Sequence, residues 1–222
     1  MGRVDSMYIL GVSISKRYPF FHIGKGCVES GNTINMHHRY GNRKNSLQIC
    51  GKDNVVESFG KVWMSAIRVE GHGNKIHIEP GCKVFKSTLV IIGNRCEITI
   101  RKTATCGNGC WLVVMGEDNH IDIGEDVMIA DDVDIWASDS HAIHDLGLGN
   151  EIVNPSGSID IHKHVWIGKR STILKNVTIG ENSVIGMASV VTKNVQAGCV
   201  AVGNPAHIVK SNVNWDRMHI TI

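Results

Sequence analysis

The most constraining feature of this sequence is a six-residue repeat that runs from Ile159 to Val209. One phase holds aliphatic or small side chains without a gap, at Ile161, Ile167, Ile173, Ile179, Ile185, Val191 and Ala197. A second phase, four places later, is occupied by Val165, Ser171, Val177, Ser183, Ser189, Val195 and Ala201. Neither the period of an α-helix nor that of a β-strand sustains this pattern. It predicts a parallel β-helix, in which each hexapeptide forms one side of a triangular coil of about 18 residues and the first phase points inward.

The composition fits such a solenoid. Aromatic residues make up only 5% of the 222 residues, as expected for a narrow interior that Ile and Val fill. A series of ordinary sandwich strands is the alternative, but it would show turn signals at looser spacing. The net charge of +2 indicates no strong attraction for nucleic acid.

The cysteines and the N-terminal region indicate the cellular compartment of the protein. Seven cysteines, with no CxxC pair, predict small buried side chains in a reducing compartment in preference to disulfides or metal ligands. The longest apolar run near the N-terminus, Tyr8–Ile14, is too short for a transmembrane segment and lacks a signal-peptide pattern. We therefore expect a cytoplasmic protein without a transmembrane segment.

A looser repeat from Gly31 to Ile123 precedes the regular one. It combines glycine and asparagine or aspartate with an alternating aliphatic pair, and Ile76, Ile98 and Ile121 recur at a nearly constant interval that is longer than three hexapeptides. We interpret these segments as wider coils of the same solenoid, with Gly-Asn turns at one corner. The expected divisions are an N-terminal segment at 1–21, irregular wide coils at 22–135, an extended loop at 136–160, regular coils at 161–209 and a tail at 210–222.

The strict frame of the repeat fails once. It passes through Ile123, Ile129 and Ile135, but the next inward position is His141, and the frame returns only at Ile161. The separation of Ile135 from Ile161 is not a multiple of six. The interval must therefore leave the coil as a loop of about twenty residues, and such a loop in a compact domain is usually functional or disordered.

His141 is the strongest catalytic candidate on this loop. Histidine has the unperturbed pKa closest to neutral pH, which suits a general base. His144 is the rival candidate. Asp139 or Asp145 could orient the imidazole, and a backbone carbonyl could equally do so. The histidines treated as background are His37, His38, His162 and His164.

Three segments between residues 121 and 210 carry a family resemblance. They are SDSHAIHD, HVWIGKRSTILKNVTIGENSVIGMASVVTKNV and the closing VGNPAHIVK. They resemble the hexapeptide-repeat O-acetyltransferases, among them galactoside and maltose acetyltransferases and enzymes that acetylate bacterial capsular polysaccharide and lipopolysaccharide. The wide Gly-Asn coils look closest to the capsule enzymes, including those acting on sialic-acid-containing capsules. The resemblance implies an all-β, left-handed parallel β-helix with a projecting catalytic loop.

The resemblance also implies roles for single residues. The family's catalytic histidine falls on His141, and Trp166, assigned to both catalysis and cofactor binding, matches a tryptophan that lines the thioester end of acetyl-CoA. The other cofactor-binding positions are Met187 and Ala188 along the pantetheine arm, Thr192 and Lys193 as a pair that contacts the cofactor, and Lys210 near the nucleotide phosphates. Family members often have a smaller residue where Met187 stands, so the cofactor path can differ there.

These assignments predict an acetyl-CoA-dependent O-acetyltransferase that acts on a sugar hydroxyl. A positioned imidazole would remove the hydroxyl proton during attack on the thioester, a step that typically contributes about 10²–10⁴ in rate. The resemblance implies a homotrimer whose cofactor and carbohydrate acceptor meet between two subunits. Capsular or lipopolysaccharide sugar is the expected acceptor, and a smaller sugar or an antibiotic is the alternative.

Two functions of other classes stay open. A metal-dependent enzyme of the β-helix carbonic anhydrase type needs three histidines at coil-compatible places. His141 and His144 are three residues apart on a loop, whereas His162 and His164 share one predicted strand, so the spacing does not match and we predict no metal site. The second alternative is a non-catalytic solenoid scaffold, which would neither bind nor hydrolyse acetyl-CoA.

Overall fold

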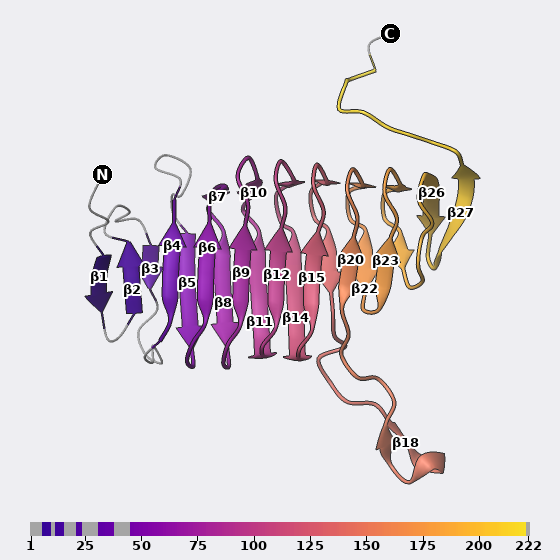
Figure 1. Ribbon diagram of the computed structural model, residues 1–222. Coiled ribbons are helices and arrows are strands. Elements are labelled where there is room, and N and C mark those ends of the chain that lie inside the picture. Colours follow the sequence, from indigo (N-terminus) through magenta and orange to yellow (C-terminus); the bar gives the residue numbers. More distant parts are fainter. Residues whose placement is uncertain (1–5, 10–11, 16–20, 24–30, 38–44, 221–222) are drawn as a thin grey trace.

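The chain winds into a parallel β-helix of three flat sheets, shown by the computed structural model in Figure 1. The structure describes residues 6–9, 12–15, 21–23, 31–37 and 45–220. From β6 onward each complete coil visits the three sheets in the same order, and equivalent strands of successive coils pair in parallel. The all-β parallel β-helix predicted from the repeat is confirmed.

We number the sheets in the order in which a coil visits them. Sheet 1 contains β1 (Ser6–Ile9), β2 (Val12–Ser15), β4 (Thr33–Met36), β6 (Val55–Ser58), β9 (Lys75–Ile78), β12 (Glu97–Ile100), β15 (His120–Ile123), β20 (Ile159–Ile161) and β23 (Val177–Ile179). Sheet 2 contains β7 (Lys61–Trp63), β10 (Lys83–Phe85), β13 (Thr105–Cys106), β16 (Met128–Ile129), β21 (Trp166–Ile167), β24 (Val184–Ile185), β26 (Cys199–Gly203) and β27 (Ala206–Ser211). Sheet 3 contains β3 (Phe21–Ile23), β5 (Asn45–Cys50), β8 (Ala66–Glu70), β11 (Thr88–Asn94), β14 (Trp111–Glu117), β17 (Asp134–Trp136), β22 (Thr172–Leu174) and β25 (Val190–Val191). The turns between sheets form a 1/2 edge, a 2/3 edge and a 3/1 edge.

Coil length changes along the stack as the sequence predicts. Ile98 pairs with Ile76 of the preceding coil and with Ile121 of the following coil, so these coils are wider than three hexapeptides. Ile159 pairs with Val177, and the interval between them is the length of three hexapeptides. Both kinds of coil therefore belong to one continuous solenoid.

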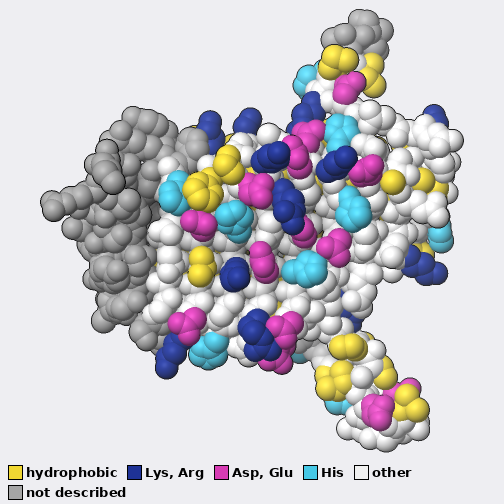
Figure 2. Space-filling view, viewed as in Figure 1, with side chains coloured by type: hydrophobic (Ala, Val, Ile, Leu, Met, Phe, Trp, Pro, Cys, Tyr) yellow, Lys and Arg dark blue, Asp and Glu magenta, His cyan; other side chains and the backbone are white. Residues whose placement is uncertain are grey.

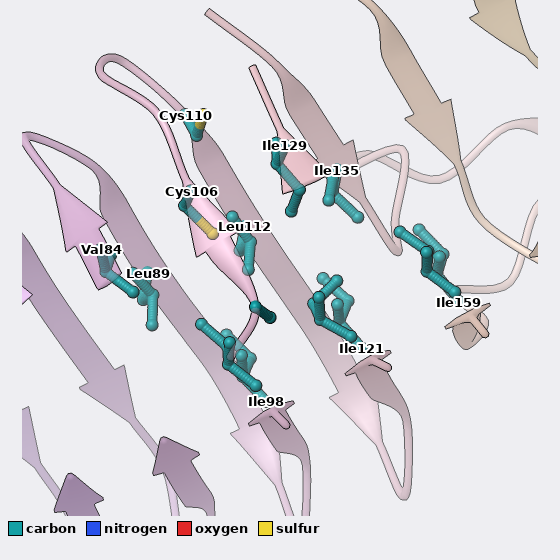
Figure 3. Close-up of a cluster of buried hydrophobic side chains, with 14 of the residues drawn as sticks. Val84, Leu89, Ile98, Cys106, Cys110, Leu112, Ile121, Ile129, Ile135 and Ile159 are labelled. Atoms are coloured by element: carbon teal, nitrogen blue, oxygen red, sulfur yellow. The ribbon is translucent and has the colours of Figure 1, made fainter. Parts of the chain in front are cut away.

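The interior of the coils is a stack of buried aliphatic side chains (Figure 3). Ile98, Ile121 and Ile159 occupy equivalent places in successive coils and are all 0% exposed. Burial of one such side chain typically stabilises a fold by about 1.5–3 kcal/mol. Five cysteines belong to the same core and form no disulfide: Cys82, Cys96, Cys106, Cys110 and Cys199.

The regular frame ends earlier than the sequence predicts. Ala197, which was expected to point inward, is exposed. Val195 is buried instead and bridges to Ile179 of the preceding coil. This last coil is shorter than three hexapeptides. The Asn194 side chain accepts a hydrogen bond from the Thr178 amide at 2.8 Å, in the place where the backbone of a further strand would otherwise accept it.

Glycine and asparagine shape the 3/1 edge of the wide coils. Gly71 adopts φ +112°, and a Cβ there would collide with the carbonyl of Gly93 in the next coil. The buried Asn74 side chain donates to the Gly93 carbonyl at 2.8 Å and accepts from the Cys96 amide at 2.9 Å. Gly-Asn turns thus lie at one corner, as predicted, because only glycine allows such close approach and asparagine pairs the turn's backbone groups.

Two segments depart from the stack, as Figure 1 shows. Residues 138–158 project at the 3/1 edge, between β17 and β20, and the segment after β27 crosses back over the 1/2 edge. Within the described part of the chain, no helix has the length and apolar character needed to cross a membrane.

Candidate functional site

Residues 138–158 form an ordered arm inside the predicted loop of 136–160. A hairpin of β18 (His144–Asp145) and β19 (Glu151–Ile152) makes its tip, together with the 3-10 turn η1 (Leu146–Leu148). The segment folds locally because the Asp145 carboxylate accepts from two backbone amides of η1, at 2.7 and 3.2 Å. The interruption of the repeat is therefore a built element.

The base of the arm is fixed by a hydrogen-bonded cluster of Asp139, Asn154 and Lys175, which we call the brace. The Asn154 side chain donates to Asp139 Oδ2 at 2.8 Å and to the His141 carbonyl at 2.9 Å, and it accepts from the Ile143 amide at 2.6 Å. Lys175 Nζ donates to Asp139 Oδ2 at 2.6 Å and to the Asn154 carbonyl at 3.0 Å. The hydrogen bonds from Lys175 and then Asn154 lower the pKa of Asp139. The brace thus holds the main chain on both sides of His141.

The His141 side chain is exposed beside the brace, so its imidazole is accessible to a substrate. Its backbone amide donates to the Asp139 carbonyl at 2.8 Å. The two carboxylates considered for orienting the ring are engaged elsewhere, because Asp139 belongs to the brace and Asp145 caps η1. The brace therefore positions His141 through its backbone.

The rival histidine has a structural role in the hairpin. His144 Nδ1 lies 3.0 Å from the carbonyl oxygen of Asn150, across the tip of the arm. This contact helps to close the turn between β18 and β19. His141 is consequently the better candidate for proton transfer.

Trp166 and Lys210 lie in one row on the outside of sheet 2. Trp166 pairs with Val184, Val184 with Val200, and Val200 with Lys210. Three strand spacings of about 4.8 Å separate the first from the last, or about 14 Å. Both ends of the row are exposed, Trp166 at 38%. An indole and a cation are therefore aligned along the axis of the coils.

The segment after β27 adds a second indole beside Trp166. The Trp215 ring centroid is 6.0 Å from that of Trp166 and 4.3 Å from that of His164, on which it stacks. From the sequence, the C-terminal region 210–222 was expected either to pack on a neighbouring subunit or to fray, because only the folded chain brings residues 51 positions apart into contact. Nothing in the local sequence pattern signals this contact.

The remaining predicted cofactor residues lie at two different edges. Met187 is 67% exposed, and with Ala188 it forms the 2/3 edge between β24 and β25. Thr192 and Lys193 are exposed and follow β25 at the 3/1 edge, the edge from which the arm projects. One chain therefore presents the predicted residues in separate groups, and His141 does not adjoin the outer face of sheet 2.

Acidic, basic and histidine side chains are interspersed on the face of the coil stack that Figure 2 shows, and several of them pair across neighbouring coils. His120 Nε2 lies 3.0 Å from Asp160 Oδ1, and Arg101 Nη2 lies 2.6 Å from Asp122 Oδ2. Among the described residues, no group of three His, Cys, Asp or Glu side chains is arranged to hold a metal ion.

Comparison with known proteins agrees with this architecture. The bacterial transferase hexapeptide family, with six repeats, matches residues 158–193. The polysialic acid O-acetyltransferase of Escherichia coli O1:K1 / APEC is 36% identical over 132 residues, which cover 60% of this chain and 39% of that protein. The polysialic acid O-acetyltransferase of Neisseria meningitidis is 33% identical over 173 residues, covering 68% of this chain and 79% of that protein. The crystal structure of the polySia specific acetyltransferase NeuO superposes with a TM-score of 0.78 at 30% identity, covering 89% of each chain.

The coil stack and the comparisons define a hexapeptide-repeat transferase. More narrowly, the chain belongs to the family of hexapeptide-repeat O-acetyltransferases that includes the polysialic acid enzymes, which are acyltransferases with a left-handed β-helix. The resemblance stated from the sequence is confirmed. The matched region spans 39% of the length of the Escherichia coli relative and 79% of the Neisseria relative.

Proposed function

We propose that this protein transfers the acetyl group of acetyl-CoA to a sugar hydroxyl of a bacterial surface polysaccharide, capsule or lipopolysaccharide. The observation that carries the proposal is the exposed His141 imidazole, held by the brace on an arm that interrupts a hexapeptide-repeat coil. The relatives named for polysialic acid support a polysaccharide as acceptor.

The transfer is a single displacement in which His141 moves one proton. The imidazole takes the proton of the sugar hydroxyl while the oxygen attacks the thioester carbonyl. The tetrahedral intermediate collapses, the carbon–sulfur bond breaks, and the imidazolium returns the proton to the CoA thiolate. A backbone amide of a neighbouring coil is the proposed donor to the oxyanion. No covalent bond to the enzyme forms.

The row on sheet 2 supports a lengthwise position for the acetyl donor. Trp166 would lie at the thioester end and Lys210 near the phosphates, about 14 Å away along the axis. A cation at that distance suits the charged end of a donor whose reactive end is apolar and uncharged. Lys193, at the 3/1 edge, would reach the same donor from a neighbouring subunit.

The separation of the predicted residues supports a site shared between subunits of a homotrimer. The arm projects from the 3/1 edge, whereas Trp166 is on the sheet opposite that edge. The arm also carries aliphatic side chains that are largely exposed in the single chain (Figure 2), at Ile143, Leu146, Leu148, Ile152 and Val153. Such an apolar arm is expected to be covered by another copy.

A second apolar surface supports the same assembly. At the 2/3 edge Trp63 is 47% exposed, Met64 43% and Trp111 44%. Trp63 also contacts Phe85 there, at a ring distance of 6.4 Å. Exposed aromatic clusters of this kind are typical of subunit interfaces. Packing of three such edges around one axis would bury them.

Activity of His141→Ala tests the proposed base. The variant should lose about 10²–10⁴ of kcat, as expected when a general base is removed. Acetyl transfer from labelled acetyl-CoA to a panel of glycans is the assay, with mass spectrometry to locate the acetyl group. His144→Ala is the matched control and should retain most activity. Near-normal turnover by His141→Ala would remove the assignment.

Mixing of two impaired variants, His141→Ala without the proposed base and Trp166→Ala without the indole at the thioester end, tests the shared site. His141→Ala and Trp166→Ala subunits, co-expressed in equal amounts, should regain about a quarter of wild-type sites if each site takes its histidine and its tryptophan from different copies. Mixtures that stay as inactive as either variant would exclude a site shared in this way, provided that native mass spectrometry shows mixed assemblies.

A further inference from the structure

Residues 212–218 lie within the predicted C-terminal region 210–222, and from here on we call these seven residues the tail. They are docked on the coil beside Trp166. Trp215 is only 8% exposed, although the tail lies outside the coil. We propose that the tail is a fixed part of the acetyl-donor groove and that Trp215 is a positioning residue for Trp166. This inference rests on the proposed function, because it assigns a role within the same donor site.

The first anchor of the tail is a reciprocal contact between Trp215 and His164. Trp215 Nε1 donates to the His164 carbonyl at 2.8 Å, and His164 Nε2 lies 2.8 Å from the Trp215 carbonyl. The two rings stack with an interplanar angle of 10°. On its other side, His164 Nδ1 lies 2.6 Å from Asp126 Oδ2 in the preceding coil. The Trp215 ring is thus fixed by hydrogen bonds and by stacking.

The second anchor is Arg217, which extends the docking across two earlier coils. Its Nε donates to Asp126 Oδ1 at 3.0 Å, and Nη1 donates to Thr105 Oγ1 at 3.3 Å. Partial burial of Asp126 acts to raise its pKa, but the hydrogen bonds from His164 and Arg217 outweigh it and lower that pKa. The Arg217 guanidinium also lies 5.7 Å from the Trp215 ring centroid. The tail therefore runs along the 1/2 edge in a defined register.

The consequence falls on Trp166. Its paired residues on the neighbouring strands are Met128 and Val184. Neither has an aromatic ring, so no ring within the sheet packs against the indole. Trp215 supplies one, since the two indoles meet at 6.0 Å with an angle of 46°. The part of Trp166 that stays exposed is then presented in one orientation. Without Trp215, the indole would sample the staggered χ1 wells and the two-fold χ2 that an exposed tryptophan has.

The core of the coil does not depend on this contact. Trp215 packs against the outside of the 1/2 edge, whereas the buried cluster is formed by inward aliphatic side chains. Removal of Trp215 should therefore disturb donor binding more than folding. Without Trp215, only about one in six orientations of the Trp166 indole would be competent to bind the donor. Removal of Trp215 should therefore weaken donor binding about five- to tenfold.

Binding of CoA to the full chain, followed by calorimetry, tests the inference. Trp215→Ala should bind CoA five- to tenfold more weakly and raise the KM for acetyl-CoA by a similar factor, with kcat and the acceptor KM little changed. Trp215→Phe should recover most of the affinity because it restores an aromatic surface. Ile220→Ala, at a side chain that is 96% exposed and lies beyond residues 212–218, is the matched control and should bind as wild type does.

The outcomes separate the two proposals. Failure of wild-type protein to bind CoA would overturn the proposed function. If wild type binds CoA and Trp215→Ala binds it equally well, the positioning role of the tail is wrong while the proposed function stands. If Trp215→Ala does not fold, Arg217→Ala loosens the tail without removing the ring, and unchanged CoA affinity in that variant would equally overturn the inference.

Discussion

Replacement of Asn154 with alanine should slow acetyl transfer without unfolding the coil. The side chain makes three hydrogen bonds, and two of them hold the main chain beside His141, at the His141 carbonyl and at the Ile143 amide. Each contributes about 1 kcal/mol when partly solvated partners are allowed for. Loss of both bonds removes about 2 kcal/mol of the free energy that holds the arm in place. The fraction of molecules whose arm is correctly positioned then falls by up to about thirtyfold. We expect kcat/KM to fall by that factor.

The assay is steady-state transfer from labelled acetyl-CoA, with thermal unfolding measured on the same samples. Thr99→Ala is the control, because that side chain also hydrogen-bonds a carboxylate, Glu97 at 2.7 Å, but on sheet 1 and away from the arm. Lys175→Met should act in the same direction as Asn154→Ala, since it removes the cation that fixes Asp139. Turnover of Asn154→Ala within about twofold of wild type, at unchanged melting temperature, would refute the brace as a positioning device.

Three further predictions concern the donor site and the coil. Lys193→Ala combined with Lys210→Ala should raise the KM for acetyl-CoA and leave acceptor binding almost unchanged, which initial rates at varied donor and acceptor concentrations will check; an effect on the acceptor alone would contradict it. Gly168→Ala should lower the free energy of unfolding in urea by about 1–3 kcal/mol, because a Cβ there would lie 2.7 Å from backbone atoms of the next coil. Gly147→Ala on the arm is the control and should lower it less, because its Cβ would meet only the Asp145 side chain. Burial raises the pKa of Cys82 to about 11, so its thiol should resist a disulfide reagent at pH 8 until the protein unfolds. Rapid labelling of Cys82 in the native protein, located by peptide mass spectrometry, would show that this part of the core is open.

The repeat made the coil predictable because its physical cause is local. Each hexapeptide places one aliphatic side chain inward, so the spacing of Ile76, Ile98 and Ile121 was enough to predict which strands pair. The arm was predictable for the same reason, since a broken frame shows where the chain leaves the stack. The frame failed at Ala197, where an asparagine side chain replaced part of a strand and shortened the last coil.

Contacts made across the stack were beyond prediction from the sequence. The brace joins Lys175 to Asp139 over 36 residues, and the tail joins Trp215 to His164 over 51. Neither distance follows from the period of six, because one contact depends on the path of the arm and the other on the chain reversing direction after β26. The candidate base His141 could be proposed from the sequence, whereas the groups that hold its backbone could not.

The triangular cross-section bears on how many copies can complete the site. The 3/1 edge, which carries the arm, points away from the outer face of sheet 2, which carries Trp166. In a dimer with a two-fold axis, the arm of each copy would have to reach Trp166 of the other copy. This is impossible because the arm and Trp166 lie on opposite sides of each chain. Such a head-to-tail contact closes only as a ring, and a ring of three is the smallest that satisfies every arm. We therefore expect sedimentation to give a trimer, and a stable monomer or a two-fold dimer with full activity would contradict the shared site.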